Sequence, residues 1–263
     1  MPDHSAALTY SSYLALDEIL GAQRPRSDEH DEMLFIVIHQ VYELWFKQMI
    51  HELGFLQRRL EQGDTAHALA TLKRVLTILK TVVAQIDVLE TMTPRQFTSF
   101  RRRLQAASGF QSAQFRELEA VLGRRDERVL DHHPPDSPAR ERIRAAMARP
   151  ALFDSLLRYL VTQGYEMPRE VTERDVRAAR EPSAAVQEVL LRVSRDDGDA
   201  AQVCERFVDL DEGVQEWRYR HVKMVERTIG ARPGTGGSAG AQYLRTTLFT
   251  PAFPDLWAIR SEL

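Results

Sequence analysis

A long apolar stripe that contains one histidine constrains the fold of this chain more than any other feature. Between residues 203 and 228, apolar side chains recur at alternating steps of four and three, which is the spacing of one face of an α-helix. We expect a long helix that ends at Gly230 and buries this face against other helices. The stripe consists of Val203, Phe207, Leu210, Val214, Trp217, His221, Met224 and Thr228.

The spacing leaves two interpretations of His221 open. It can be a core imidazole that is hydrogen-bonded to a carbonyl or a carboxylate, and spacing alone favours this interpretation. It can also be an axial ligand of a metal, with the loop of small residues at 234–240 closing over a small ligand. The rest of the chain has to decide between the two.

Helical spacing recurs in other parts of the chain. Residues 33–56 and 69–89 both have apolar residues at helical intervals. One helix is expected to start at Ser27, and another at Thr93, where an N-cap residue precedes Pro94. No series of segments alternates with a period of two, so the prediction is an all-α fold, a single large helical bundle.

The chain is expected to form one domain over residues 1–263. No stretch is rich enough in Pro, Gly or Ser to be a flexible linker, and no repeat of roughly 20 to 50 residues is evident. Residues 1–24 form an N-terminal segment in which Tyr10 and Tyr13 precede a short helical pattern. These aromatic side chains either pack on the chain's own core or dock on a neighbouring subunit.

Composition excludes several classes of protein. The chain has 35 Lys and Arg against 38 Asp and Glu, with a net charge of −3, and these charges are interspersed, so we expect no nucleic-acid partner. No apolar segment is long enough to span a membrane and no signal peptide is evident, so we expect a cytoplasmic protein without a membrane association. The single cysteine, Cys204, excludes an internal disulfide and agrees with a reducing compartment.

Motifs for other chemistries are incomplete. The glycine-rich loop lacks the lysine of a phosphate-binding loop and follows a helix, where a dinucleotide fingerprint needs a strand. Cys204 falls on an apolar helix face beside Phe207, so it is interpreted as an inert core thiol. Two histidines, His39 and His221, lie in long apolar helices among aromatic residues, which is compatible with non-covalent haem. Arg101 shares a helix face with Phe97 and can be either a surface residue or a carboxylate clamp.

Six segments together resemble the tryptophan 2,3-dioxygenase family, and the resemblance extends from about Leu8 to about Leu244. The segments are MLFIVIHQ at 33–40, ELWFK at 43–47, LETMTP at 89–94, ASGFQS at 107–112, WRYRH at 217–221 and GTGGSAG at 234–240. Several separate motifs in the same order make chance agreement very small.

This resemblance implies a helical bundle that encloses haem b and opens the indole 2,3-bond of L-tryptophan with dioxygen, giving N-formylkynurenine. It also implies a homotetramer. By matched position, His221 is the proximal ligand of the iron and His39 is the distal histidine that hydrogen-bonds the indole N–H. The other implied site residues are Phe35 and Phe97 as indole walls, Arg101 on the substrate carboxylate, Thr235 on the ammonium, Ser108 and Trp217 beside the haem, and Tyr10, Tyr13 and Leu14 in a neighbour's pocket.

Three alternatives accompany this interpretation. Ile38 stands where members of the family have a polar residue, which favours as first alternative a related haem monooxygenase that acts on a modified tryptophan. The second alternative is a haem-binding or sensing module without turnover, although such a module needs no carboxylate clamp. The third is a helical scaffold without a cofactor, which would show no Soret band.

Overall fold

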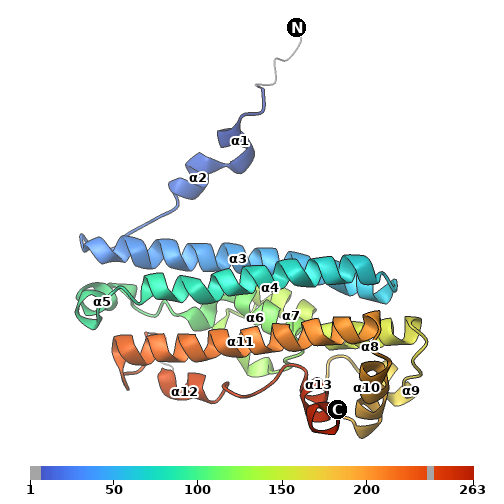
Figure 1. The fold of residues 1–263 in the computed structure, drawn as a ribbon. Helices are drawn as coiled ribbons and strands as arrows, with labels where there is room; N and C mark the ends of the chain where they lie inside the picture. The colour runs from blue at the N-terminus through green and yellow to red at the C-terminus, as the bar shows by residue number, and fades with distance from the viewer. Residues whose placement is uncertain (1–6, 236–239) are drawn as a thin grey trace.

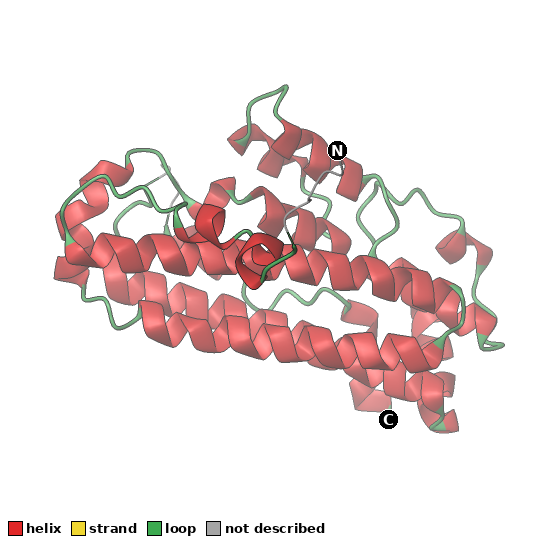
Figure 2. Ribbon diagram, turned by 90° about the horizontal axis from the view of Figure 1, so that it is seen from above, coloured by secondary structure: helices red, strands yellow, loops and turns green. Residues whose placement is uncertain are grey.

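The computed structural model describes residues 7–235 and 240–263, and helices are the regular elements of these residues, with no strand among them (Figures 1 and 2). The predicted all-α fold is therefore confirmed. None of the helices in these two ranges is long and apolar enough to cross a membrane.

Three long helices form the frame of the molecule: α3 (His30–Glu61), α4 (Thr65–Leu89) and α11 (Asp199–Ile229). They run side by side, and α4 packs against both of the others (Figure 1). The predicted stripe of α11 supplies fully buried residues such as Phe207 and Leu210. The predicted end is confirmed as well, because Gly230 follows the last helical turn with a φ of 60°, a left-handed conformation that glycine adopts without strain.

A glycine lets α11 approach α4 closely. A Cβ atom placed on Gly213 would lie 2.6 Å from the Cδ2 atom of Leu79, which is too close for two carbon atoms. Gly213 stands on the same helix as His221, two turns earlier. The absence of a side chain at this position therefore leaves room for Leu79 to pack directly on the backbone of the histidine-bearing helix.

The start of α3 differs from the prediction. The helix begins at His30, not at Ser27, because Ser27 caps no helix and instead donates its hydroxyl to Glu32 at 2.5 Å. The backbone N–H groups of Arg26 and Ser27 also donate to the Glu32 carboxylate, at 2.9 and 2.8 Å. The buried carboxylate therefore fastens the incoming chain to the first turn of the helix.

Shorter elements cover one side of the frame. These are α5 (Pro94–Arg101), η1 (Arg102–Leu104), η2 (Gly109–Gln111), α6 (Ala113–Val121), η3 (Glu127–His132), α7 (Pro138–Met147) and α8 (Leu152–Thr162). Thr93 starts α5 as predicted, since its hydroxyl accepts from the N–H of Gln96 and the Gln96 side chain accepts from the N–H of Thr93. Helices α6 and α8 pack on α3.

The C-terminal elements are α9 (Arg169–Thr172), α10 (Ala184–Asp196), α12 (Ala241–Arg245), α13 (Pro254–Ala258) and η4 (Ile259–Glu262). They lie at both ends of α11: α12 packs near its C-terminal end, α10 and α13 pack near its N-terminal end, and α9 packs on α8 (Figure 1). Asp211 of α11 holds the segment before α13, because its carboxylate accepts from the backbone N–H groups of Ala252 and Phe253 at 3.0 and 2.9 Å and from Trp257 Nε1 at 3.0 Å.

The N-terminal segment extends away from the bundle (Figure 1). It contains α1 (Tyr10–Leu14) and α2 (Leu16–Leu20), and no residue of either helix is buried. Tyr10 and Tyr13 are 77% and 71% exposed. The interpretation that these aromatic residues pack on the chain's own core is therefore wrong for this chain on its own.

Candidate active site

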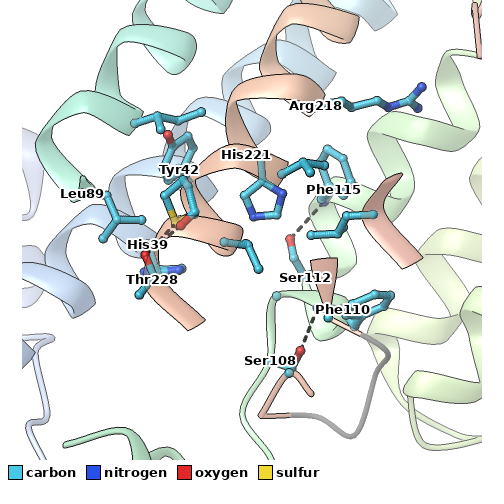
Figure 3. Close-up of a pocket in the computed structure, with 18 of the residues that line it drawn as sticks. His39, Tyr42, Leu89, Ser108, Phe110, Ser112, Phe115, Arg218, His221 and Thr228 are labelled. Atoms are coloured by element: carbon cyan, nitrogen blue, oxygen red, sulfur yellow. Dashed lines mark hydrogen bonds between the residues drawn. The ribbon is translucent and has the colours of Figure 1, made fainter. Parts of the chain in front are cut away.

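One cavity of about 260 Å³ contains both histidines that the sequence singled out. Helices α3, α4, α5, α6, α11 and α12 all contribute to its wall. His221 projects into it from α11, between His39 on one side and Phe115 on the other (Figure 3). The bundle thus brings together residues that lie about 180 positions apart in the chain.

His221 has the environment of a ligand and not that of a satisfied core histidine. Its imidazole makes no hydrogen bond with any part of the chain that the structure describes, and it lines the cavity. Burial lowers the pKa of His221 to about 4, with smaller contributions from His39 and Arg116. The ring is therefore neutral at pH 7, which is the form that binds a metal.

Trp217 fixes the plane of the His221 ring. The two rings stack with their centroids 5.1 Å apart and an angle of 7° between their planes. Phe115 of α6 packs on the other edge of Trp217 at a centroid distance of 5.0 Å. Phe115 thus supports Trp217, and the stacking of Trp217 on His221 restricts rotation of the imidazole.

His39 presents one nitrogen to the cavity as an acceptor. Its Nδ1 lies 2.6 Å from the backbone carbonyl of Phe35, and because a carbonyl only accepts, Nδ1 carries the proton. The Nε2 atom of the neutral ring then keeps a free lone pair. Burial lowers the pKa of His39, which preserves this neutral form.

Aromatic rings form a wall beside His39. Phe35 packs on the His39 ring with a centroid distance of 4.1 Å, and it contacts Phe97 and Phe100 at 5.7 and 5.6 Å. Phe97 and Phe100 meet edge to face at 5.5 Å. Phe35 and Phe97 therefore give the cavity an apolar aromatic wall, with Phe100 buried behind them, against which a small aromatic ligand can pack.

Arg101 and Thr235 meet at the loop end of the cavity. The Arg101 guanidinium donates to the backbone carbonyl of Pro233, and the Thr235 hydroxyl donates to the carbonyl of Ala107 at 2.5 Å. Both side chains line the cavity, so Arg101 is not simply a surface residue. The remainder of the predicted loop, residues 236–239, lies outside the described residues.

The other predicted site residues divide into two groups. Ser108 and Trp217 line the cavity, and Ser108 caps η2 by accepting from the N–H of Phe110 at 3.3 Å (Figure 3). Tyr10, Tyr13 and Leu14 lie on α1 and do not reach the cavity of their own chain. Ile38 is buried within the bundle and does not line the cavity either.

The sequence interpretation missed a group of buried charges in the cavity wall. Arg116 donates to Glu119 at 2.6 Å and Arg124 donates to the same carboxylate at 2.9 Å, while Arg218 lies 3.6 Å from it. The sequence carries no signal for their burial, because opposite charges one helical turn apart are usual on solvated helices. When Arg101 and Glu43 are included, the cavity wall contains four arginines and two glutamates, which is an excess of two positive charges.

These features define a class of protein: an all-helical protein whose cavity suits a flat, dianionic metal macrocycle together with a small aromatic ligand. A neutral imidazole without a partner supplies a ligand for the metal, and the excess of two positive charges matches two carboxylates.

Comparison with known sequences identifies the family. The sequence profile described as "Tryptophan 2,3-dioxygenase" matches residues 2–143 and 183–263. A curated tryptophan 2,3-dioxygenase of Anaeromyxobacter sp. (strain K) is 76% identical over 260 residues, which is 99% of this chain and 98% of that protein. Those of Herpetosiphon aurantiacus and Caulobacter vibrioides are 56% and 43% identical, covering 98% and 97% of this chain and 100% and 98% of their own lengths. The chain belongs to the tryptophan 2,3-dioxygenase family, as its motifs predicted.

Proposed function

We propose that this chain is a haem-dependent tryptophan 2,3-dioxygenase. It inserts both atoms of dioxygen across the C2–C3 bond of the indole of L-tryptophan and gives N-formylkynurenine. Full-length identity of 76% to a curated tryptophan 2,3-dioxygenase is the observation that carries the proposal. The cavity supports it, because His39, His221 and Arg101 all face the same space.

His221 is the residue that would hold the haem iron. Its ring is neutral, makes no competing hydrogen bond with the described residues and is fixed in orientation by Trp217. The haem, when bound, supplies an iron centre that activates dioxygen. Ser108 and Trp217 would contact the macrocycle from the cavity wall.

His39 would hold the indole N–H of the substrate. The free lone pair on its Nε2 atom accepts this hydrogen, since Nδ1 is engaged with the carbonyl of Phe35. The rings of Phe35 and Phe97 confine the indole beside the imidazole. This arrangement orients the C2–C3 bond and excludes water from it.

Arg101 and Thr235 would bind the amino-acid part of the substrate. Their present acceptors are the backbone carbonyls of Pro233 and Ala107, so each side chain can redirect its hydrogen bonds without losing a charged partner. Arg101 would form a bidentate pair with the carboxylate, and the Thr235 hydroxyl would accept from the ammonium.

Replacing Arg101 by Ala should raise KM for L-tryptophan about 10- to 100-fold, which is the loss of one charge-assisted pair. Tryptamine lacks the carboxylate, so its binding should be nearly the same in the variant and the parent. Steady-state kinetics with both compounds test the assignment. Arg95→Ala, on an exposed position of the same helix, is the matched control.

Oxygen counting tests the proposed reaction. The ferrous protein is incubated with L-tryptophan and isotopically labelled dioxygen, and the product is weighed. Incorporation of both oxygen atoms supports the dioxygenase, and incorporation of one would instead support the monooxygenase. Haem binding without formation of any product would instead support the haem-binding or sensing module. Ile38, the residue that favoured the monooxygenase, lies away from the cavity.

The N-terminal residues Tyr10, Tyr13 and Leu14 would complete the cavity of a neighbouring subunit. Their exposure in the single chain supports this proposal, because aromatic side chains that project into water gain free energy when they are covered. We also propose a homotetramer. The cytoplasmic location and the single-domain organisation stay predictions.

A further inference from the structure

Arg116 is a buried cation with unused hydrogen-bonding capacity in the cavity wall. The residue is only 6% exposed and lies on α6. Its guanidinium lies over the rings of Phe110 and Phe115, at 5.3 and 5.5 Å from their centroids. The Nη1 atom donates to Glu119, whereas the buried Nε atom has no acceptor in the described part of the chain. A buried N–H group without an acceptor is costly, so it calls for a partner that the chain does not supply.

Glu119 cannot be that partner, because three guanidinium groups share its one carboxylate. Its Oε2 atom accepts from Arg116 at 2.6 Å. Its Oε1 atom accepts from Arg124 at 2.9 Å and lies 3.6 Å from Arg218. Glu119 and Asp126, which lies 3.5 Å from Arg124, are two negative charges beside three positive charges, so the cluster keeps one excess positive charge, which favours an additional anion.

The other two arginines find further oxygen atoms within the chain. Arg124 donates to the Tyr243 hydroxyl at 3.3 Å and lies 3.5 Å from the Asp126 carboxylate. Arg218 donates to the backbone carbonyls of Thr247 and Thr250 at 3.4 and 3.2 Å. Arg116 makes no second hydrogen bond with the described residues. Its Nε–Nη2 edge, the edge that binds a carboxylate with two parallel hydrogen bonds, therefore has no partner among the described residues.

Ring contacts connect Arg116 to the side of the cavity that holds His221. Arg116 lies over Phe115, Phe115 packs on Trp217 at 5.0 Å, and Trp217 stacks on His221 at 5.1 Å. Arg101, the proposed partner of the substrate carboxylate, lies on α5 and bonds the loop at Pro233. The cavity thus has two distinct arginine sites for carboxylates.

We infer that Arg116 binds a propionate carboxylate of the haem through its Nε–Nη2 edge. This inference rests on the proposed function, since it requires that the cavity holds haem. The carboxylate would satisfy the buried Nε–H group and offset the excess positive charge around Glu119. Arg116 is therefore a cofactor-binding residue in addition to His221.

Haem loss measures this contact without reference to turnover. The protein is loaded either with haem or with haem dimethyl ester, in which both propionates are neutral, and transfer to excess apomyoglobin is followed by absorbance. The parent should lose the ester at least about tenfold faster than the acid, which corresponds to one charge-assisted hydrogen bond. Arg116→Met should lose the acid nearly as fast as the ester, and Arg116→Lys should be intermediate, because lysine keeps the charge without the two-pronged edge.

Arg260→Met is the matched control. The Arg260 Nε atom also lacks an acceptor among the described residues, but this arginine pairs with Glu205 and does not line the cavity. The ratio of ester loss to acid loss should stay at the parental value in this variant.

Three results would overturn the inference. Equal rates of loss of haem and of its dimethyl ester from the parent protein would overturn the inference. This comparison needs no variant, so it remains decisive even if Arg116→Met fails to fold. A folded Arg116→Met variant with the parental ratio of ester loss to acid loss would also overturn the inference, and the proposed haem-dependent function would be unaffected. A raised Kd for L-tryptophan with an unchanged ratio would assign the carboxylate to the substrate. Absence of a Soret band in the parent would remove the proposed function as well, so the two failures are distinguishable.

Discussion

At the scale of single residues, His221 depends on Trp217 for its orientation and on burial for its neutral charge. Replacing His221 by Ala should abolish stable haem binding, because among residues 7–235 and 240–263 His39 supplies the one other imidazole that faces the cavity. The helix content should change little, since alanine has a high helix propensity. A Soret titration together with circular dichroism measures both quantities.

His51→Ala is the control for this variant, because His51 lies on the same long helix as His39 and is exposed outside the cavity. It should bind haem like the parent. Full Soret absorbance in folded His221→Ala would show that the ligand assignment is wrong.

His39 predicts the pH dependence of activity. Its neutral ring accepts the indole hydrogen, and burial lowers its pKa from the ordinary value of about 6.5. As the pH falls through 6.5, kcat/KM should therefore stay constant. It should decline only at lower pH, because the ring then becomes protonated and its Nε2 atom donates a hydrogen bond instead of accepting one. A decline centred at or above pH 6.5 in the parent, and absent in His39→Ala, would contradict the depressed pKa.

The sequence predicted the histidines of the site better than its charges. His39 and His221 are conspicuous because an imidazole on an apolar helix face needs an explanation. Arg116 and Glu119 are not conspicuous, because a pair of opposite charges one turn apart is usual on solvated helices. Their burial arises when α6 packs on α3 and α7, and no local pattern contains these tertiary contacts.

At the scale of secondary structure, Asp211 links the histidine-bearing helix to the C-terminal segment. Asp211→Ala should remove the acceptor of three N–H groups of the C-terminal segment and of the Gln215 side-chain amide, in a site where Asp211 is 1% exposed. We expect a loss of about 3 kcal/mol in the free energy of unfolding, or a Tm lower by about 10 °C. Thermal unfolding and limited proteolysis between residues 247 and 257 measure the effect.

Asp209→Ala is the control for this prediction, because Asp209 forms an exposed ion pair with Arg206 on the same helix. Its effect on Tm should be within about 2 °C. Similar melting of the two variants would show that Asp211 does not anchor the segment.

Helices with long periodic stripes were predicted well, whereas their boundaries were predicted less well. The predicted start of α3 at Ser27 was wrong because the Ser27 hydroxyl donates a hydrogen bond to Glu32 instead of capping the helix. Residues 109–121 likewise form two elements, η2 and α6, because Ser112 adopts an extended conformation and caps α6. In both cases a side-chain hydrogen bond overrides the propensity of the backbone.

At the scale of the whole molecule, the N-terminal segment is the part that a single chain leaves unexplained. Deletion of residues 1–24 should reduce the assembly to a smaller oligomer and raise KM for L-tryptophan several-fold, because Tyr10, Tyr13 and Leu14 would no longer cover a neighbour's cavity. Light scattering coupled to gel filtration, together with steady-state kinetics, measures both effects.

A Tyr10→Ala, Tyr13→Ala double variant separates the aromatic contacts from the length of the segment. It should raise KM in the same direction. A truncated protein that stays tetrameric with unchanged KM would show that the segment does not serve a neighbour. The sequence alone left this question open, because the chemistry of exposed aromatic residues is the same whether the surface that covers them belongs to one chain or to another.

The stacking of Trp217 on His221 also gives the protein an internal optical sensor. An excited indole that lies within a few ångströms of a haem ligand transfers its energy to the macrocycle, so its fluorescence is extinguished when the cofactor is present. Trp45 and Trp257 lie outside the cavity wall and Trp217 lies within it. Transfer to haem also reaches the other two tryptophans over longer distances, so the fall in total emission, with Trp217 the most strongly quenched, would record in the unlabelled protein whether the cofactor is in place.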